Sequence, residues 1–275
     1  MPAGESDRLA ELPKNGYAAG YGPRTHPVCP RNGMSETIWY LKRCSLFERV
    51  TPAEAQRLEA HSSLRSFARR EIIYFPGEPG HSVLVLARGR VKIKTVTPDG
   101  RETISAFIVE GELFGELALL DAAPRGEFAE AVEPSQVLAV PRADIIWLMD
   151  RRPDVALHVT KLFGFRLRRV ENRLRNILFR SNRERIVALL LELLDSHGQK
   201  DADGWEIQLR LSHQDLANLI GATRETVTGT LGQLQHEGLI VVRRQRIRVI
   251  KRARLVAEAE SAEPVERGRP VAPPK

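Results

Sequence analysis

The stretch from Leu211 to Ile240 constrains the fold of this chain more than any other, because it predicts two short helices joined by a tight turn. Ser212 is placed to cap the first helix, with Asp215 three residues later in the position of a capping box. Gly221 supplies the sharp bend, and Thr223 provides the N-cap of the second helix. Apolar residues recur at helical spacing in both helices, at Leu216, Leu219, Ile220, Val227, Leu231 and Leu234. The pattern predicts a helix-turn-helix.

Polar residues at the start of the second predicted helix suit DNA recognition. Arg224, Glu225 and Thr228 point away from its apolar face. In a helix-turn-helix these N-terminal residues enter the major groove, where an arginine can bond a guanine edge and a glutamate can accept from a cytosine amine. An ordinary helical hairpin with a solvated polar face is the alternative. The coincidence of cap, turn, core spacing and polar pair favours DNA binding.

Composition and charge agree with a DNA-binding protein. A chain of 275 residues has room for about two domains, and 42% hydrophobic and 28% charged residues are typical of globular proteins. The net charge of +7 favours an acidic partner, and nine Lys or Arg against three Asp or Glu lie between Arg210 and Arg254. No apolar run approaches the roughly 18 residues of a membrane span, and no signal core is evident at the N-terminus. We expect a cytoplasmic protein without a membrane partner.

The first half of the chain predicts a β-rich domain. Residues 1–35 are rich in Gly, Pro, Ala and charge, which predicts a disordered tail. Between about residues 66 and 145, β-rich runs such as Ser82–Leu86 alternate with glycines, and Pro98–Gly100 forms a hairpin turn. Strands spaced roughly 8–12 residues apart predict a barrel or roll, within a domain that we place at residues 36–152.

A long helix follows, with a seam of apolar residues along it. It is predicted from Pro153 to Phe179, within a segment 153–180. The apolar residues repeat at spacings of 4, 3, 4 and 3, as in a coiled coil; they are Phe163, Leu167, Val170, Leu174 and Ile177. Such a seam predicts a homodimer, and the alternative is that the stripe packs on its own domain.

The helix-turn-helix lies within a second predicted domain, residues 181–255. A capped helix from Asn182 to Ser196 leads through a polar link to a strand at 205–210. After the helix-turn-helix, two apolar strands flank a basic tip and form a wing, whose Arg243 and Arg244 we expect on DNA. Residues 256–275 predict a disordered tail.

From about Ile38 to Leu255 the chain resembles the Crp–Fnr family of bacterial transcription regulators. Four stretches carry the resemblance: Phe75-Pro-Gly-Glu-Pro-Gly80; Gly111-Glu-Leu-Phe-Gly-Glu-Leu117, which is the phosphate cassette of the family; Arg183-Glu-Arg-Ile-Val187; and Leu211–Ala217 with Thr223–Thr228. The resemblance implies an α+β fold with a cyclic-nucleotide-binding-like β-roll (double-stranded, jelly-roll-like), a dimerisation helix and a winged helix-turn-helix.

The resemblance also implies a sequence-specific regulator that binds a pseudo-palindromic operator as a homodimer, with half-sites about 34 Å apart and RNA polymerase as a further partner. By motif, Arg224 and Glu225 match base readers. Family positions that contact phosphates or base edges are matched by Ser212, Gln214, Thr223, Thr226 and Thr228. One departure is Gly229, which stands where the family usually has an arginine. We therefore do not carry over the operator preference of the relatives.

The effector is left open by the resemblance. Gly115, Glu116 and Leu117 match the cassette that holds ribose in cyclic-nucleotide-binding relatives, and Arg125 matches the phosphate-binding arginine. Arg125 is followed by Gly126-Glu127 instead of a hydroxyl residue and Ala, and Val170-Glu171 replaces the Thr-Ser pair that meets the purine in the cyclic-AMP receptor. These departures disfavour a cyclic nucleotide, and the cassette can equally be a retained turn in which Glu116 caps backbone amides.

Other cofactors have less support. An iron–sulfur cluster of the Fnr type needs about four thiolates, whereas the chain has two cysteines, Cys29 and Cys44. The Cys29-Pro30 step is a weak pointer to haem. The histidines show no metal-ligand pairing, and His213, on the outer face of the helix-turn-helix, suits a phosphate contact or plain solvation.

Two further functions are weighed against a transcription regulator. One is a cyclic-nucleotide-binding module that acts on a protein partner, which the helix-turn-helix and basic wing disfavour. The other is an enzyme, for which the sequence offers no Ser-His-Asp, metal or phosphate-loop constellation. We expect no catalytic activity.

Overall fold

The computed structural model describes residues 35–121 and 123–261, which form two compact units. The first unit comprises residues 35–175 and the second residues 176–261, and each is described by itself. The predicted N-terminal tail up to residue 34, the Cys29-Pro30 step and residues 262–275 lie outside the described residues.

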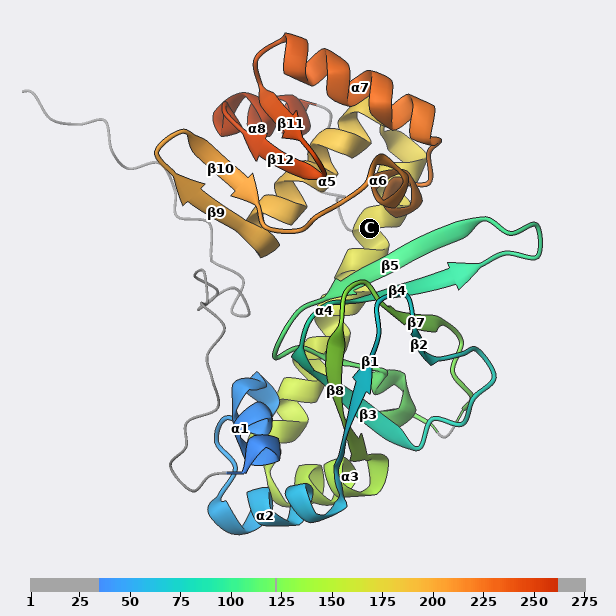
Figure 1. Cartoon of the computed structure of the whole chain (residues 1–275), viewed down its shortest axis with the longest axis vertical. Coiled ribbons are helices and arrows are strands. Elements are labelled where there is room, and N and C mark those ends of the chain that lie inside the picture. The colour runs from blue at the N-terminus through green and yellow to red at the C-terminus, as the bar shows by residue number, and fades with distance from the viewer. Residues whose placement is uncertain (1–34, 122, 262–275) are drawn as a thin grey trace, which may run out of the picture. The chain divides into compact units, whose positions relative to one another are not determined.

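The first unit is a β-roll made of two antiparallel sheets (Figure 1). One sheet has the order β1-β8-β3-β6 and the other the order β2-β7-β4-β5. The strands are β1 Ser63–Phe67, β2 Ile72–Tyr74, β3 Ser82–Arg88, β4 Val91–Val96, β5 Glu102–Ile108, β6 Leu113–Phe114, β7 Phe128–Ala131 and β8 Ser135–Pro141. The predicted roll is confirmed.

Strand β3 separates two apolar cores, because successive side chains of a strand point to opposite faces. Leu84 and Leu86 point into the roll and pack with residues from both sheets, including Phe114. Val83 and Val85 point to the other side and pack against helices. Burial on both faces explains why this strand reads as an uninterrupted apolar run.

Helices cover the outer face of the sheet that contains β3. They are α1 Glu36–Arg43, the short η1 Ser45–Phe47, α2 Pro52–His61, α3 Arg142–Arg151 and α4 Pro153–Phe179, while η2 Glu116–Leu119 lies in the cassette. The predicted long helix thus has the expected bounds. No helix in the described ranges is long and apolar enough to cross a membrane.

The second unit is a winged helix-turn-helix. Its helices are α5 Asn182–His197, α6 His213–Ile220, α7 Arg224–His236 and α8 Arg252–Ser261, and its strands are β9 Gly198–Asp201, β10 Gly204–Ile207, β11 Ile240–Arg243 and β12 Arg246–Val249. The strands form one antiparallel sheet in the order β11-β12-β10-β9 (Figure 1). The predicted wing is therefore part of a four-stranded sheet.

Two boundaries in this unit differ from the sequence prediction. The polar link at 197–204 contains strand β9, which pairs with β10 although it lacks apolar alternation. The predicted tail from residue 256 begins inside helix α8, so the folded unit extends to Ser261 instead of ending at residue 255. Leu255, fully buried, anchors α8, and Glu258 joins it to Arg183 of α5 with an N–O distance of 2.7 Å.

Candidate DNA-binding and effector sites

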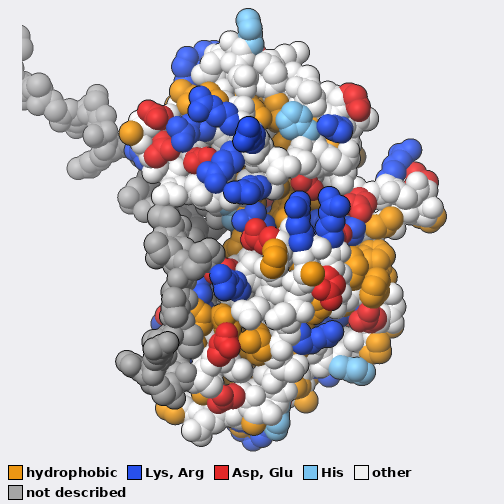
Figure 2. All heavy atoms as spheres, viewed as in Figure 1, with side chains coloured by type: hydrophobic (Ala, Val, Ile, Leu, Met, Phe, Trp, Pro, Cys, Tyr) orange, Lys and Arg blue, Asp and Glu red, His pale blue; other side chains and the backbone are white. Residues whose placement is uncertain are grey.

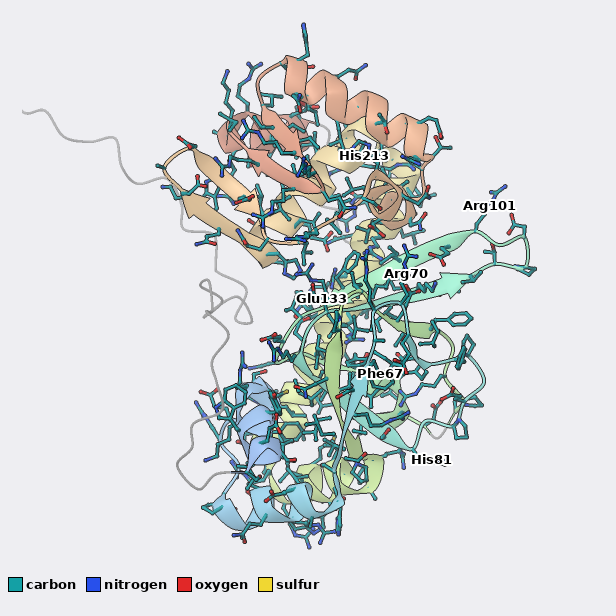
Figure 3. The ribbon with its side chains drawn as sticks, viewed as in Figure 1. Phe67, Arg70, His81, Arg101, Glu133 and His213 are labelled. Carbon is teal, nitrogen blue, oxygen red and sulfur yellow. The ribbon has the colours of Figure 1, made fainter. Side chains whose placement is uncertain are left out.

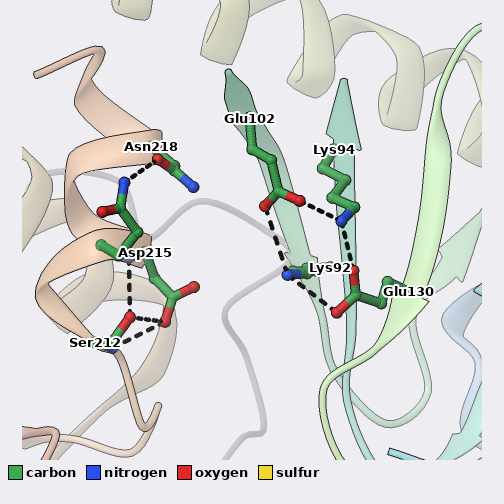
Figure 4. Close-up of polar contacts among 8 residues, drawn as sticks. Lys92, Lys94, Glu102, Glu130, Ser212, Asp215 and Asn218 are labelled. Carbon is green, nitrogen blue, oxygen red and sulfur yellow. Dashed lines mark hydrogen bonds and ion pairs between the residues drawn. The ribbon is translucent and has the colours of Figure 1, made fainter. Parts of the chain in front are cut away.

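The turn between α6 and α7 is built by three local features. Ser212 Oγ accepts from the Asp215 backbone N–H at 3.1 Å, and the Asp215 carboxylate accepts from the Ser212 backbone N–H at 2.9 Å, so the predicted capping box is present (Figure 4). Gly221 ends α6 with a φ of 69°, a left-handed conformation that suits glycine. Thr223 then caps α7 through the backbone N–H of Thr226. Local sequence therefore positions the second helix.

Arg224 and Glu225 occupy the exposed N-terminal end of α7. The opposite face of α7 is buried through Val227, Leu231 and Leu234. Neither Arg224 nor Glu225 forms a side-chain hydrogen bond or ion pair within the described residues. Their head groups are therefore available to a ligand, as base readers must be.

The other residues predicted to contact DNA differ in how many hydrogen bonds their polar groups already form within the protein. The Ser212 hydroxyl both accepts and donates within its cap, because Oγ also donates to Asp215 Oδ2 at 2.6 Å. Gln214, exposed, donates to Asn218 Oδ1 at 2.8 Å (Figure 4). Thr228 Oγ1 donates to the Arg224 carbonyl at 2.8 Å. Ser212 thus serves mainly to hold α6, whereas Gln214 can exchange its partner at little cost.

The basic tip of the wing is divided into paired and unpaired arginines. Arg246 and Arg248 of β12 form ion pairs with acids of the β9–β10 hairpin. Arg243 and Arg244 are exposed and form no ion pair within the described part of the chain. Lys and Arg side chains gather over the strands of this sheet (Figure 2). A bond from the Leu211 N–H to the Gln245 carbonyl, 3.1 Å, brings the tip next to the start of α6.

The apolar seam of α4 is largely exposed in the single chain. Phe163 is half-buried and packs against the helices of the first unit. The other seam residues are 50–62% exposed; they are Leu167, Val170, Leu174 and Ile177. The alternative in which the stripe packs on its own domain therefore holds for Phe163 alone.

Downstream of the cassette, Arg125 is already bound to the protein. Its Nη1 donates to the Gly115 carbonyl at 2.8 Å, its Nη2 donates to the Ser82 carbonyl at 2.6 Å, and its guanidinium lies 4.4 Å from the ring centre of Tyr74. Gly115 has a φ of 66°, and a Cβ there would lie 2.2 Å from Arg125 Nη1. The left-handed backbone favours glycine at this position, and a side chain there would also displace the Arg125 guanidinium.

Glu116 is buried and paired with the long helix. Its Oε1 lies 2.5 Å from Arg166 Nη1 of α4, and Arg166 Nη2 donates to the Leu113 carbonyl. The carboxylate pairs with an arginine side chain, a partner that the expectation of backbone-amide capping by Glu116 did not include. Oε2 is buried without a hydrogen-bond partner in the described residues. Burial raises the pKa of Glu116, while the charge of Arg166 opposes the rise.

Glu127, which replaces the small residue of relatives, also faces this region. Its Oε1 accepts from the Tyr74 hydroxyl at 3.3 Å. Burial, and then the negative charge of Glu116, raises the pKa of Glu127. Leu117, the remaining cassette residue in the prediction, is 54% exposed and contributes no polar group.

A small hollow of about 80 Å³ lies beside Arg125, between the two sheets. It is lined by Arg65, Phe67, Ile73, Tyr74, Glu78, Pro79, Ser82, Leu84, Arg125, Val137 and Ala139. Ligand sites for drug-sized molecules usually enclose about 300–1,000 Å³. The hollow is therefore smaller than a typical ligand site in this conformation. In the described residues, no group of three or more His, Cys, Asp or Glu could hold a metal ion.

Sequence reasoning missed two contacts at these sites. Nothing in the local sequence marks Arg166 as the partner of an acid 50 positions earlier. His213 was placed on an outer face, whereas its Nδ1 lies 2.8 Å from Thr228 Oγ1. The only feature of the sequence that could have pointed to Arg166 is its position on the long helix, next to the apolar seam.

Comparison with known proteins matches both units. The cyclic nucleotide-binding domain model matches residues 64–152, and the Crp-like helix-turn-helix domain model matches residues 184–258. The chain is 35% identical over 188 residues to the global nitrogen regulator of Synechococcus elongatus, covering 68% of this chain and 85% of the relative. It is 33% identical over 200 residues to the cyclic AMP receptor protein of Thermus thermophilus, covering 73% and 89%. The solved structure of FixK2 from Bradyrhizobium japonicum is similar with a TM-score of 0.63 and 27% identity, covering 71% of this chain and 96% of that one.

Proposed function

Because this chain belongs to the Crp–Fnr family of DNA-binding transcription regulators, we propose that it binds a pseudo-palindromic operator as a homodimer. The observation that carries the proposal is the exposed apolar row Leu167, Val170, Leu174 and Ile177 on α4. Exposure of such a row to water is unfavourable. In a dimer with a two-fold axis beside α4, the four residues of one copy pack against the same four residues of the other and are buried. Two recognition helices then address two half-sites.

At each half-site the exposed end of α7 reads bases. Arg224 fits a guanine edge and Glu225 a cytosine amine. Gln214, Thr223, Thr226 and the wing arginines hold the backbone, with Ser212 shaping the start of α6. Gly229 offers no side chain, so each half-site has one side-chain reader fewer than the family pattern.

The β-roll modulates this binding through an effector that the chain's chemistry leaves unnamed. The Thermus thermophilus relative is described as a cyclic AMP receptor protein, and a cyclic nucleotide is the reference compound to test. Arg125 and Glu116 are bound to Gly115, Ser82 and Arg166 in the present conformation. The departures at Gly126-Glu127 and Val170-Glu171 disfavour a cyclic nucleotide as that effector.

The proposed setting is the cytoplasm, with RNA polymerase as the partner of the DNA-bound dimer and no catalysed reaction. The Synechococcus elongatus relative is described as a global nitrogen regulator, and the exposed groups at α7 suit binding. Transcription from a selected site with purified RNA polymerase, with and without the protein, tests this part.

Selection from a random duplex pool tests the central proposal. The purified protein should enrich a sequence with two inverted half-sites whose centres are about one helical turn apart. Recovery of no sequence, or of a single half-site bound by one chain, would contradict it. Repeating the selection with cyclic AMP shows whether that ligand changes the affinity.

A further inference from the structure

The apolar seam of α4 fixes a heptad register for the charged residues beside it. Leu167 and Val170 stand three residues apart within the 4-3 repeat, so they mark an a and a d position of a coiled coil. Arg166, which precedes the a residue, therefore occupies a g position. Glu171, which follows the d residue, occupies an e position. Side chains at e and g are the ones that form salt bridges between two coiled helices.

The charges at these two positions select one orientation of a helix pair. When two copies of α4 pair in parallel, a g residue of one copy faces the e residue of the following heptad in the other. Arg166 of one copy then faces Glu171 of the second copy, and the two-fold axis repeats the pair. In an antiparallel pair g faces g and e faces e, which brings like charges together. The charges therefore favour the parallel pair.

Arg166 is held by its own chain and keeps donors for a second acid. Helix α4 passes behind strands of the β-roll, with side chains between them (Figure 3). A guanidinium has five N–H donors; here Nη1 lies 2.5 Å from Glu116 Oε1, and Nη2 donates to the Leu113 carbonyl. The side chain is still 26% exposed. An arginine that its own roll already orients loses little further freedom when it binds a carboxylate.

Glu171 has no partner in its own chain. It is exposed, and within residues 35–121 and 123–261 its carboxylate forms no hydrogen bond or ion pair. Arg168 and Arg175 lie one helical turn away on either side, at spacings that often form ion pairs, yet neither binds it in this part of the chain. The carboxylate is therefore free to meet a second copy.

We propose that Arg166 of each copy binds Glu171 of the other, so that each cassette is completed by a residue of the second chain and the two α4 helices pair in parallel. The inference rests on the proposed homodimer. Arg166 then bridges two carboxylates, Glu116 of its own cassette and Glu171 of the partner copy. Cassette and dimer interface thus share one guanidinium. A ligand that displaces Glu116 from Arg166 acts directly on the pairing of the two copies.

The test is the strength of self-association of the full-length chain without DNA, measured by sedimentation equilibrium. At low salt, Glu171→Gln should raise the dissociation constant of the dimer about tenfold, because two pairs are lost and each contributes about threefold. Asn172→Lys is the matched control: it makes the same change in charge at an exposed neighbour outside the a, d, e and g positions, and it should leave the constant unchanged. In about 1 M salt, where the Debye length is about 3 Å, the effect of Glu171→Gln should largely disappear.

A double-mutant cycle identifies the group that Glu171 binds. In an Arg166→Gln background, Glu171→Gln should change the dissociation constant little further, because the partner is already gone. Thermal unfolding checks that Arg166→Gln is folded. If it is not, Glu171→Arg decides, because it places a like charge opposite Arg166 and should weaken the dimer more than Glu171→Gln does.

Three results would count against these assignments. An unchanged dissociation constant in Glu171→Gln at low salt would overturn the proposed pair. An effect of full size in the Arg166→Gln background would overturn it as well, because Glu171 would then bind another group. A wild-type protein that sediments as a single chain at every concentration would instead overturn the proposed homodimer.

Discussion

At the scale of single residues, each functional side chain is defined by what else it already binds. Arg224 is exposed and unpaired within the described residues, whereas Arg125 is held by two carbonyls and an aromatic ring. A free guanidinium can bind a new partner at little cost. A guanidinium that must turn away from its carbonyl partners to reach a ligand loses hydrogen bonds worth about 0.5–1.5 kcal/mol each. Arg224 is therefore free to bind a ligand, whereas Arg125 is already partly engaged by the protein.

Arg224→Ala should weaken binding to the selected operator by about 1–3 kcal/mol and relax the preference at one base pair in each half-site. The reason is loss of a bidentate contact to a base edge. Competition binding with every single-base variant of the operator measures both effects. Arg243→Ala, in the wing, is the control and should weaken all variants by a similar factor. A specificity profile that Arg224→Ala leaves unchanged would remove Arg224 from the readout.

Glu127→Gln should stabilise the protein at pH 7, because burial and Glu116 disfavour its charge and raise its pKa. A carboxyl with a raised folded-state pKa destabilises the fold as pH rises through that pKa, and has no such effect below its ordinary value near 4.3. The gain should therefore shrink as pH falls and vanish below about 4.3. Urea unfolding at several pH values measures it, with Glu48→Gln at an exposed site as control. Destabilisation by Glu127→Gln at pH 7 would contradict this account.

At the scale of elements, local sequence patterns were sufficient to predict most of the helices and strands. Capping residues, the Gly221 turn and the apolar repeat predicted α6, α7 and α4 closely. Strand β9 was not predictable because Gly198-Gln-Lys-Asp201 has no apolar face and depends on pairing with β10. Helix α8 has the Ala, Glu and Arg content of a solvated tail and depends on burial of Leu255.

In the candidate sites, too, features set by local sequence were predictable, and contacts made by other elements were not. Arg224 and Glu225 were predictable because helical spacing alone sets which face they occupy. The partners of Glu116 and Arg125 were not, because they come from other elements of the folded chain. Nothing in the local pattern near Glu116 indicates a residue on α4.

Recognition helix α7 carries a glycine that its own fold does not require. A Cβ at Gly229 would meet no atom within 4 Å. Gly229→Ala should therefore raise the free energy of unfolding by up to about 1 kcal/mol, as expected from helix propensity. Gly221→Ala is the contrasting variant, because its φ of 69° should make alanine destabilising. Thermal unfolding of both compares them, and a loss of stability in Gly229→Ala would reveal a contact that the open space does not suggest.

At the scale of the whole molecule, the proposed function depends on two copies of the chain. Leu167 is 60% exposed at the centre of the seam, and Leu167→Asp would place a charge from each copy in the apolar interface. The variant should run as a single chain in light scattering and lose operator binding. Leu157→Asp is the control, because Leu157 is 53% exposed on the same helix but lies outside the 4-3 repeat. A dimeric Leu167→Asp would show that another surface joins the copies.

The most direct measurement is the mass of the protein bound to a duplex that carries one copy of the selected operator. We predict two chains of 30.9 kDa on each duplex, with a half-site duplex bound much more weakly. A complex containing one chain, bound with the same sequence preference, would contradict the account.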